Sequence, residues 1–156
     1  YTLSLHDALP IFYRTTIPYE LSIKELRYRD NRASQLIIYG RIPMMITANC
    51  TVKNTIGCNR ANKRLTIVDR KNESFSVVCN CDYCYNTIYN SKKYIAFDLR
   101  NEILSLGVKE LRLEFTVETG DEVEEILSAY DTVFNQNIPY KFKEGFTKGH
   151  LKRGVE

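Results

Sequence analysis

The sequence contains no tryptophan and only two histidines, His6 and His150, among its 156 residues. Scarce histidine weakens any hypothesis of a cysteine protease, because the catalytic thiolate needs a nearby imidazole. The motifs H-E-x-x-H and G-x-S-x-G are also missing, which argues against a zinc metalloprotease and an α/β-type serine hydrolase. No apolar run reaches the length of about 18 residues that a membrane span needs, so we expect no membrane partner.

Charge and composition describe an ordinary globular chain. Lysine and arginine number 22 against 19 acidic residues, which gives a formal net charge of +3. This basic excess is small and is weak support for nucleic-acid binding. The first residues have neither a basic segment nor a small-residue cleavage site, so no signal peptide is predicted and we expect a cytoplasmic protein.

Residues 1–11, YTLSLHDALPI, resemble the in-frame translation of a common short-read sequencing adapter. We therefore leave them out of the fold prediction and treat residues 12–156 as the natural part. A truncated reading frame is the expected origin. The missing N-terminal part of the same protein would then be the first partner of this chain.

Short apolar segments alternate with amphipathic ones along the chain. The expected strands are residues 17–21, 35–47, 93–97 and 110–117. Helices are expected to begin at Ser22, Asp98 and Thr119, and in the first and last of these a glutamate three residues later completes a capping box. Alternation of strands and helices predicts an α/β fold with parallel strands.

A cysteine-rich insert, residues 48–91, interrupts this alternation and contains all five cysteines. Within it, RLTIVDR and SFSVVCN flank the turn KNE, which predicts a β-hairpin. The hairpin is followed at once by a C-x-x-C motif. The insert lies after a buried strand, where sites of α/β proteins collect.

Four of the cysteines form two pairs, Cys50 with Cys58 and Cys81 with Cys84. Thiolates grouped in this way suit zinc or an iron–sulfur centre. We expect Cys79 to face away and leave it out of this set, although it could replace a neighbour. Three alternatives stay open: buried core thiols, a redox dithiol, and disulfides, the last disfavoured by the odd number of cysteines.

Polar residues near the expected strands are candidates for substrate contacts. Arg112 and Glu114 lie on one face of the strand 110–117, which is either the interior of a barrel or an exposed surface. His150 lies in a basic tail and is either a catalytic base or a solvated side chain.

Basic and aromatic residues surround the cysteines and raise the hypothesis of RNA binding. Basic groups can neutralise phosphates and aromatic faces can stack on unpaired bases, but the same residues would also suit a solvated hairpin with tyrosines packed beneath it. The residues concerned are Arg41, Lys53, Arg60, Lys63, Arg64 and Arg70, with Tyr39, Tyr83, Tyr85 and Tyr89.

Five segments in this order carry a family resemblance: YGRIPMMITANC, LTIVDRKNESFSV, CDYCYNTIYNS, LGVKELRLEFTVE and FTKGHLKRGVE. From Pro18 to Glu156 the chain resembles the closing portion of the collagenase-like U-32 peptidase family, in particular its longer members. The resemblance implies a partial (β/α) barrel-type fragment carrying the cysteine-bearing hairpin. It also implies that cysteines at positions 50, 58, 81 and 84 bind a cluster.

Three functions are expected as alternatives. The first, which the resemblance implies, is a peptidase-family hydrolase acting on peptides, whose catalytic groups lie mostly in the missing portion; the residues themselves offer Arg41, Arg112, Glu114 and His150 as candidate substrate contacts. The second is an RNA-hydroxylation factor acting on transfer or ribosomal RNA with a four-iron four-sulfur cluster. The third is a structural thiolate module that binds zinc or another metal without catalysis. No catalytic residue is assigned, because the family's own signature is not intact in this chain.

Overall fold

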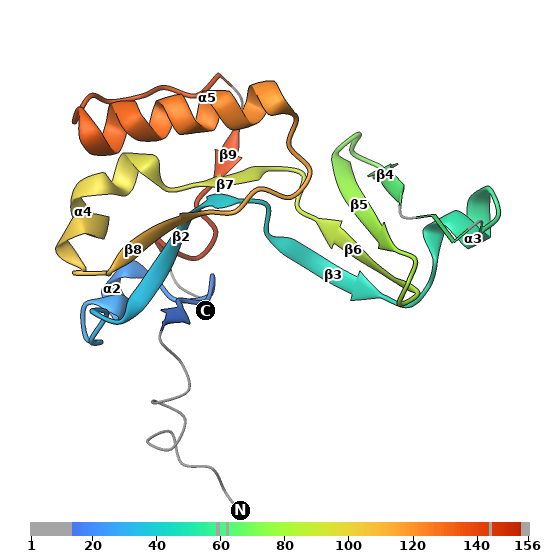
Figure 1. Cartoon of the computed structure of the whole chain (residues 1–156), viewed down its shortest axis with the longest axis horizontal. Helices are drawn as coiled ribbons and strands as arrows, with labels where there is room; N and C mark the ends of the chain where they lie inside the picture. The colour runs from blue at the N-terminus through green and yellow to red at the C-terminus, as the bar shows by residue number, and fades with distance from the viewer. Residues whose placement is uncertain (1–13, 59, 62, 144, 154–156) are drawn as a thin grey trace, which may run out of the picture.

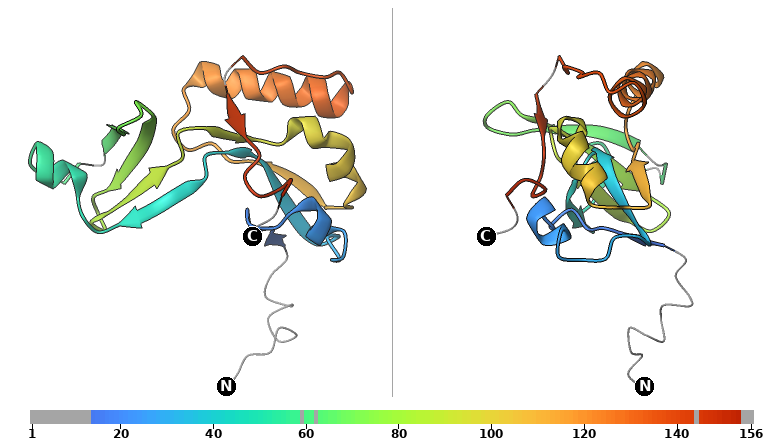
Figure 2. Two further views of the ribbon diagram at one scale, coloured as in Figure 1. Left: turned by 180° about the vertical axis from the view of Figure 1, so that it is seen from behind. Right: turned by 90° about the vertical axis from the view of Figure 1, so that its left-hand side faces the viewer.

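The computed structural model describes residues 14–58, 60–61, 63–143 and 145–153, so the adapter-like residues 1–11 lie outside it. The described chain forms two β-sheets. The first carries most of the helices, and the second extends to one side with a single short helix beside it (Figure 1). The view from behind also shows the second sheet projecting away from the first (Figure 2, left).

The first sheet is built around a central buried strand and is mainly parallel. Its strands are β1 (Thr15–Thr16), β2 (Ser34–Gly40), β7 (Lys93–Ile95), β8 (Glu110–Leu113) and β9 (Phe146–Thr147). β1 and β8 run parallel to β2, whereas β7 runs antiparallel to it. Because β1 and β8 both pair with β2 in parallel, the carboxyl ends of these three strands lie at one edge of the sheet.

Helices connect the strands of this sheet and cover its apolar residues. They are α2 (Ile23–Leu26), the 3-10 turn η1 (Phe97–Leu99), α4 (Arg100–Ser105), α5 (Gly120–Tyr130) and the π-helical turn η2 (Asp131–Asn135). Ile38 of β2, Phe97 of η1, Ile103 of α4 and Ile126 of α5 are all buried in one core. The capping boxes expected at Ser22 and Thr119 are both confirmed.

The second sheet has four antiparallel strands in the order β3-β6-β5-β4. They are β3 (Pro43–Thr47), β4 (Lys63–Val68), β5 (Ser74–Asn80) and β6 (Tyr85–Tyr89), and helix α3 (Thr51–Thr55) precedes β4. Val52 of α3 packs with Val77, Cys79 and Cys81 in a second, separate core. The predicted hairpin is therefore confirmed as β4 and β5, but it belongs to a larger sheet.

Several predicted elements are wrong in detail. Residues 35–47 form two strands in different sheets, because the chain turns after Gly40. The second of these strands, β3, is exposed along most of its length, whereas a buried strand was expected. Residues 17–21 form no strand, since pairing with β2 is limited to Thr15 and Thr16. Asp98 does not cap a helix; its carboxylate pairs with Lys148 instead.

The predicted α/β class is confirmed at the level of two sheets combined with helices. Within the described part of the chain, the strands of the first sheet do not close into a barrel. The parallel strands β1, β2 and β8 are nevertheless neighbours in the sheet, which leaves the carboxyl ends of three strands together.

Candidate functional site: a thiol cluster and an arginine-lined cavity

The cysteines gather at one end of the second sheet, between α3 and the turn that follows β5. Cys50 is the N-cap of α3, and its Sγ accepts a hydrogen bond from the backbone N–H of Lys53 at 3.4 Å. Cys50 also packs against the core that contains Cys79 and Cys81. The start of α3 thus brings the first thiol to the strand that leads to the later ones.

Cys81 lies at the centre of the group. Its side chain is buried, and its Sγ donates a hydrogen bond to the carbonyl of Ala61 at 3.0 Å, which ties the loop after α3 to the turn after β5. Burial raises the pKa of the Cys81 thiol. Four neighbouring thiols raise this pKa further, because thiolates repel one another. They are Cys58, Cys79, Cys50 and Cys84.

The C-x-x-C motif forms a tight turn. The backbone N–H of Tyr83 donates to the carbonyl of Asn80 at 3.3 Å, and Cys84 has a φ of +53°, a left-handed conformation that is uncommon outside glycine. The Cys84 thiol is exposed and lies 3.8 Å from the carbonyl of Cys81. This turn keeps the exposed thiol of Cys84 next to the buried Cys81.

Cys58 is exposed on the loop between α3 and β4. Its Sγ accepts a hydrogen bond from the backbone N–H of Arg60 at 3.4 Å, just as Cys50 accepts one from Lys53. The thiolate is the form of cysteine that binds metals. Hydrogen bonds to sulfur are one way in which proteins tune metal–thiolate centres.

The prediction that Cys79 faces away from the other thiols is wrong. Cys79 is buried with Cys81 in the same core, and its Sγ lies 3.7 Å from the hydroxyl of Thr51. Strand geometry explains this, because residues two apart in an extended segment share a face. Its burial and its contact with α3 make Cys79 a packing residue beneath the more accessible thiols.

All five thiols are free, so disulfides do not organise this region. The donor set fits zinc or an iron–sulfur cluster by its chemistry, since four thiolates are the ligands of both kinds of centre. Among the described residues, no three metal-binding side chains converge closely enough to enclose one ion. The thiols are therefore neighbours, and binding a metal would require them to draw together.

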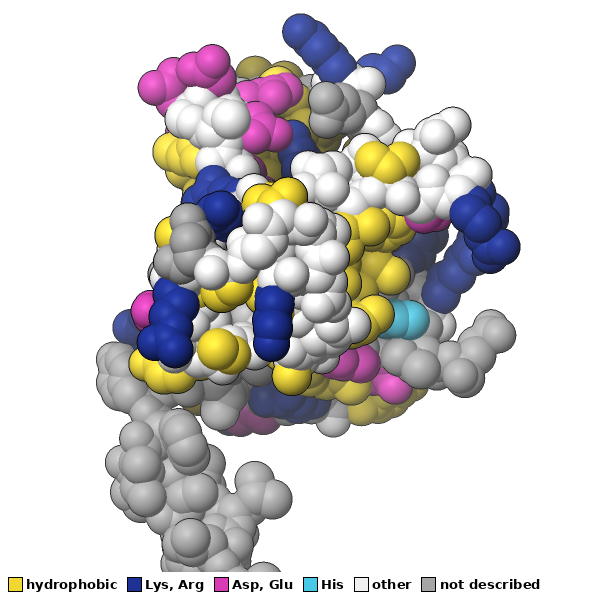
Figure 3. Space-filling view, turned by 90° about the vertical axis from the view of Figure 1, so that its right-hand side faces the viewer, with side chains coloured by type: hydrophobic (Ala, Val, Ile, Leu, Met, Phe, Trp, Pro, Cys, Tyr) yellow, Lys and Arg dark blue, Asp and Glu magenta, His cyan; other side chains and the backbone are white. Residues whose placement is uncertain are grey.

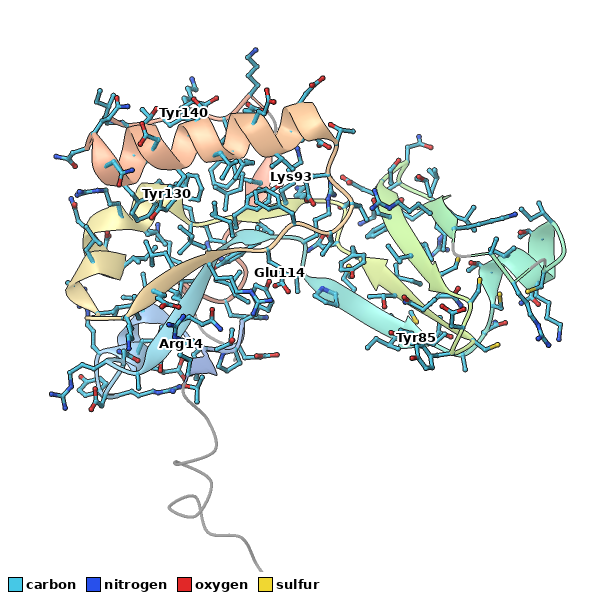
Figure 4. All side chains as sticks on the ribbon, in the orientation of Figure 1. Arg14, Tyr85, Lys93, Glu114, Tyr130 and Tyr140 are labelled. Carbon is cyan, nitrogen blue, oxygen red and sulfur yellow. The ribbon has the colours of Figure 1, made fainter. Side chains whose placement is uncertain are left out.

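A second site lies at the carboxyl ends of β1, β2 and β8. A cavity of about 360 Å³ is lined there by eleven residues, which include Arg41, Arg112 and Glu114. Figure 4 shows Glu114 between the end of β8 and the start of β3. Three of the four predicted substrate-contact residues are therefore brought together, although β8 itself ends one residue before Glu114.

Glu114 organises the outer part of the cavity. It accepts a hydrogen bond from the hydroxyl of Tyr19 at 2.9 Å and another from Arg112 at 3.2 Å. Burial raises the pKa of Tyr19 well above its ordinary value, and the hydrogen bond to Glu114 adds to the shift. A Cβ atom at Gly40 would lie 3.2 Å from the Tyr19 hydroxyl and from the backbone oxygen of Glu114, so glycine permits this close approach.

Glu118 fixes the position of Arg41, the other arginine among the lining residues of the cavity. Its fully buried side chain lies 3.4 Å from Arg41 Nε and accepts a hydrogen bond from the hydroxyl of Tyr39 at 3.1 Å. The backbone N–H groups of Thr116 and Val117 also donate to it, at 2.7 and 3.0 Å. Arg41 in turn donates to the carbonyl of Ser91 at 3.3 Å, so one ion pair fixes the loop after β8 against the start of the second sheet.

The fourth candidate, His150, lies in the turn after β9 and does not line this cavity. The basic residues around the cysteines also do not form a single patch. On the face that carries the second sheet, lysine and arginine side chains are separated by uncharged and apolar atoms (Figure 3).

The sequence alone did not single out Tyr19, which lines this cavity, or Glu118, which holds its residue Arg41. Tyr19 lies within the expected strand 17–21, and Glu118 directly follows the expected strand 110–117. Residues at the carboxyl ends of parallel strands commonly form sites, but the sequence does not reveal that Tyr19 and Glu114, 95 residues apart, meet.

Comparison of the chain with protein-family models, curated proteins and solved structures gives no match. No helix of the described chain is long and apolar enough to cross a membrane.

Proposed function

We propose that the second sheet is a thiolate module that binds an iron–sulfur cluster or zinc through Cys50, Cys58, Cys81 and Cys84. The observation that carries this proposal is the grouping of thiols from two distant segments around Cys81. Cys50 packs into the same core as Cys81, Cys84 closes the turn beside it, and the loop after Cys58 accepts its hydrogen bond at Ala61. When bound, a four-iron four-sulfur cluster would supply electron transfer or substrate activation, whereas zinc would supply stability.

In this proposal the first sheet is part of a (β/α) barrel from a protein resembling the U-32 peptidase family. The support is topological: β1, β2 and β8 are parallel neighbours in the sheet and come in that order along the chain, although β3 to β7 intervene before β8 and β7 joins the sheet antiparallel. Peptide-bond hydrolysis would then belong to the remainder of the protein, which would also supply the missing strands. This chain would contribute the thiolate module and the cavity at the strand ends.

Anaerobic reconstitution with iron and sulfide tests the thiolate module. We expect broad visible absorption from thiolate-to-iron charge transfer. Cys84→Ser should reduce both the absorption and the bound iron, and Cys79→Ala should retain them as a matched control. A colourless protein with bound zinc would assign the zinc form. If neither metal binds, the cysteines are core thiols and the proposal fails.

RNA hydroxylation is a second candidate, supported by one feature of the thiol turn. Tyr83, between Cys81 and Cys84, is 81% exposed, and its ring lies 6.5 Å from that of Tyr85. An exposed aromatic ring beside a cluster could stack on an unpaired base. Crosslinking of the reconstituted chain to single-stranded RNA should decrease in Tyr83→Ala. Equal crosslinking by both proteins would remove this candidate.

A further inference from the structure

The cavity at the strand ends has features that the thiolate proposal does not use. It lies where three parallel strands end, the position at which α/β sheets commonly bind small molecules. Its volume of about 360 Å³ is enough for a small ligand. Two arginines are among its lining residues, Arg41 after β2 and Arg112 within β8.

Each guanidinium is held in place by a carboxylate of the loop after β8. Arg112 donates one hydrogen bond to Glu114, which is also bound by Tyr19, and Arg41 is fixed between Glu118 and the carbonyl of Ser91. A guanidinium has five N–H donors, so one or two such contacts leave donors for a ligand. Arginines fixed in this way are preorganised to bind planar or tetrahedral oxyanions through paired hydrogen bonds.

An unsatisfied polar group adds to this picture. Within the described chain, the hydroxyl of Thr116 is buried and has no hydrogen-bond partner, whereas the buried Arg41 Nε makes no hydrogen bond but is ion-paired with Glu118 at 3.4 Å. Thr116 lines the cavity. Buried polar atoms are normally hydrogen-bonded, so this hydroxyl indicates a place for a ligand or ordered water. A cation does not suit this cavity, because two arginines line it and both carboxylates already accept hydrogen bonds from the protein.

We propose that this cavity binds an oxyanion, a carboxylate or phosphate group of a small molecule, between Arg41 and Arg112. Thr116 supplies a further hydroxyl, and Glu114 and Glu118 position the arginines. The proposal concerns a site separate from the cysteines and does not depend on their binding a metal.

Inorganic phosphate and malonate test the two sources of such a group. The full chain is titrated with each anion to about 50 mM at constant ionic strength and followed by amide NMR, since a Kd near 1 mM corresponds to about −4 kcal/mol. We expect saturable shifts at Gly40 and Thr116. Saturation by phosphate alone identifies a phosphate site, and saturation by malonate alone or by both identifies a site for carboxylates. Saturation by neither anion overturns the proposal.

Arginine variants separate a built site from general attraction by charge. Arg112→Gln should weaken binding about tenfold or more, because a hydrogen bond to a charged group is lost. Arg112→Lys should also weaken it, because lysine keeps the charge but not the planar fork. Arg27→Gln, an exposed arginine outside the cavity, should bind like the natural chain. Undiminished binding by Arg112→Lys, or equal loss in Arg27→Gln, would overturn the proposal.

A cysteine variant keeps this test apart from the thiolate module. Cys84→Ser should lose the metal but retain anion binding. If the natural chain binds the metal but no anion, the proposal of a thiolate module stands and that of an oxyanion site is refuted.

Discussion

At the scale of single residues, Glu118 is the buried carboxylate that holds Arg41 beside the cavity. Its side chain is completely buried and is compensated by Arg41, the Tyr39 hydroxyl and two backbone N–H groups. A buried charge is tolerated only with such compensation. Glu118 therefore couples the loop after β8 to the end of β2.

Glu118→Ala should destabilise the chain by about 3–5 kcal/mol, because it leaves the Arg41 guanidinium buried without its partner. Glu118→Gln, which keeps the size and most of the hydrogen bonds, should cost less. Urea unfolding measures both. Glu124→Ala, at an exposed position of α5, is the matched control and should change stability by no more than about 0.5 kcal/mol. Equal effects of the Glu118 and Glu124 variants would contradict this role.

Three buried tyrosines predict sensitivity to alkali. Burial raises the pKa of Tyr19, Tyr39 and Tyr94, and neighbouring carboxylates raise the first two further. Above a pH of about 10 the unfolded chain ionises at these positions while the folded chain stays protonated, so stability falls as the pH rises. Absorbance at 295 nm should therefore show part of the tyrosinate signal appearing only with unfolding. A titration that matches the urea-unfolded chain throughout would refute the prediction.

The residues of the cavity show what the sequence could reveal at this scale. Strand alternation correctly placed Arg112 and Glu114 together, since a local rule decides it. Tyr19 and Glu118 were not assigned to the cavity, because their position depends on how β1 and the loop after β8 approach β2. The same rule, applied correctly, would also have placed Cys79 beside Cys81.

At the scale of elements, the N-terminal end of α5 combines a capping box with an ion pair to strand β7. Glu122 accepts the backbone N–H of Thr119 at 2.8 Å and lies 2.8 Å from Lys93 Nζ of β7. The hydrogen bond from Lys93, followed by that from Thr119, holds the pKa of Glu122 below its usual value. The helix start and the sheet are thus joined through one carboxylate.

This contact predicts an acid-sensitive contribution to stability. Because the folded-state pKa of Glu122 is lowered, its stabilisation is present above the ordinary value of about 4.3 and is lost as the pH falls through the lowered pKa. Urea midpoints at pH 7 and pH 3 should therefore differ less in Glu122→Gln than in the natural chain. Glu124→Gln should leave the difference unchanged. A full difference in Glu122→Gln would contradict the assignment.

Strand β3 is an exposed edge of the second sheet. Met44, Met45 and Ile46 are 59%, 54% and 69% exposed, and β3 pairs only with β6 in the described sheet. Exposed apolar edge strands promote association. We expect the chain to self-associate with concentration, and Ile46→Lys to weaken this in sedimentation. Ile138→Lys, at a 51% exposed position away from the edge, should not. A monomer at all concentrations would contradict the prediction.

Elements with strong local signals were predictable, and those defined by tertiary context were not. The capping boxes at Ser22 and Thr119 and the β4–β5 hairpin are local patterns, and all are confirmed. The continuous strand over residues 35–47 was wrong because apolar residues on the exposed β3 resemble those of the buried β2. Hydrophobicity alone does not distinguish a buried strand from an exposed edge.

At the scale of the molecule, the chain has two cores that are joined at a narrow place. The first contains β2, Phe97 and α5, and the second contains Val52, Val77 and the thiols. At the junction, the Asn90 N–H donates to the carbonyl of Ile42 at 2.9 Å, and Arg41 donates to the carbonyl of Ser91. The thiol site belongs to one core and the cavity lies where the two meet.

This arrangement predicts that metal binding stabilises one core more than the other. A ligand that binds only the folded form stabilises the unit that holds it, and locally opening units exchange their amides separately. After anaerobic reconstitution, hydrogen exchange should slow in β4, β5 and β6 and remain unchanged in β2 and α5. Cys84→Ser provides the control, since the same treatment should then slow exchange in neither sheet. Equal protection of both sheets would contradict this prediction. It would mean that the two sheets open as one unit and that the contacts at Arg41 and Asn90 transmit the whole effect of binding.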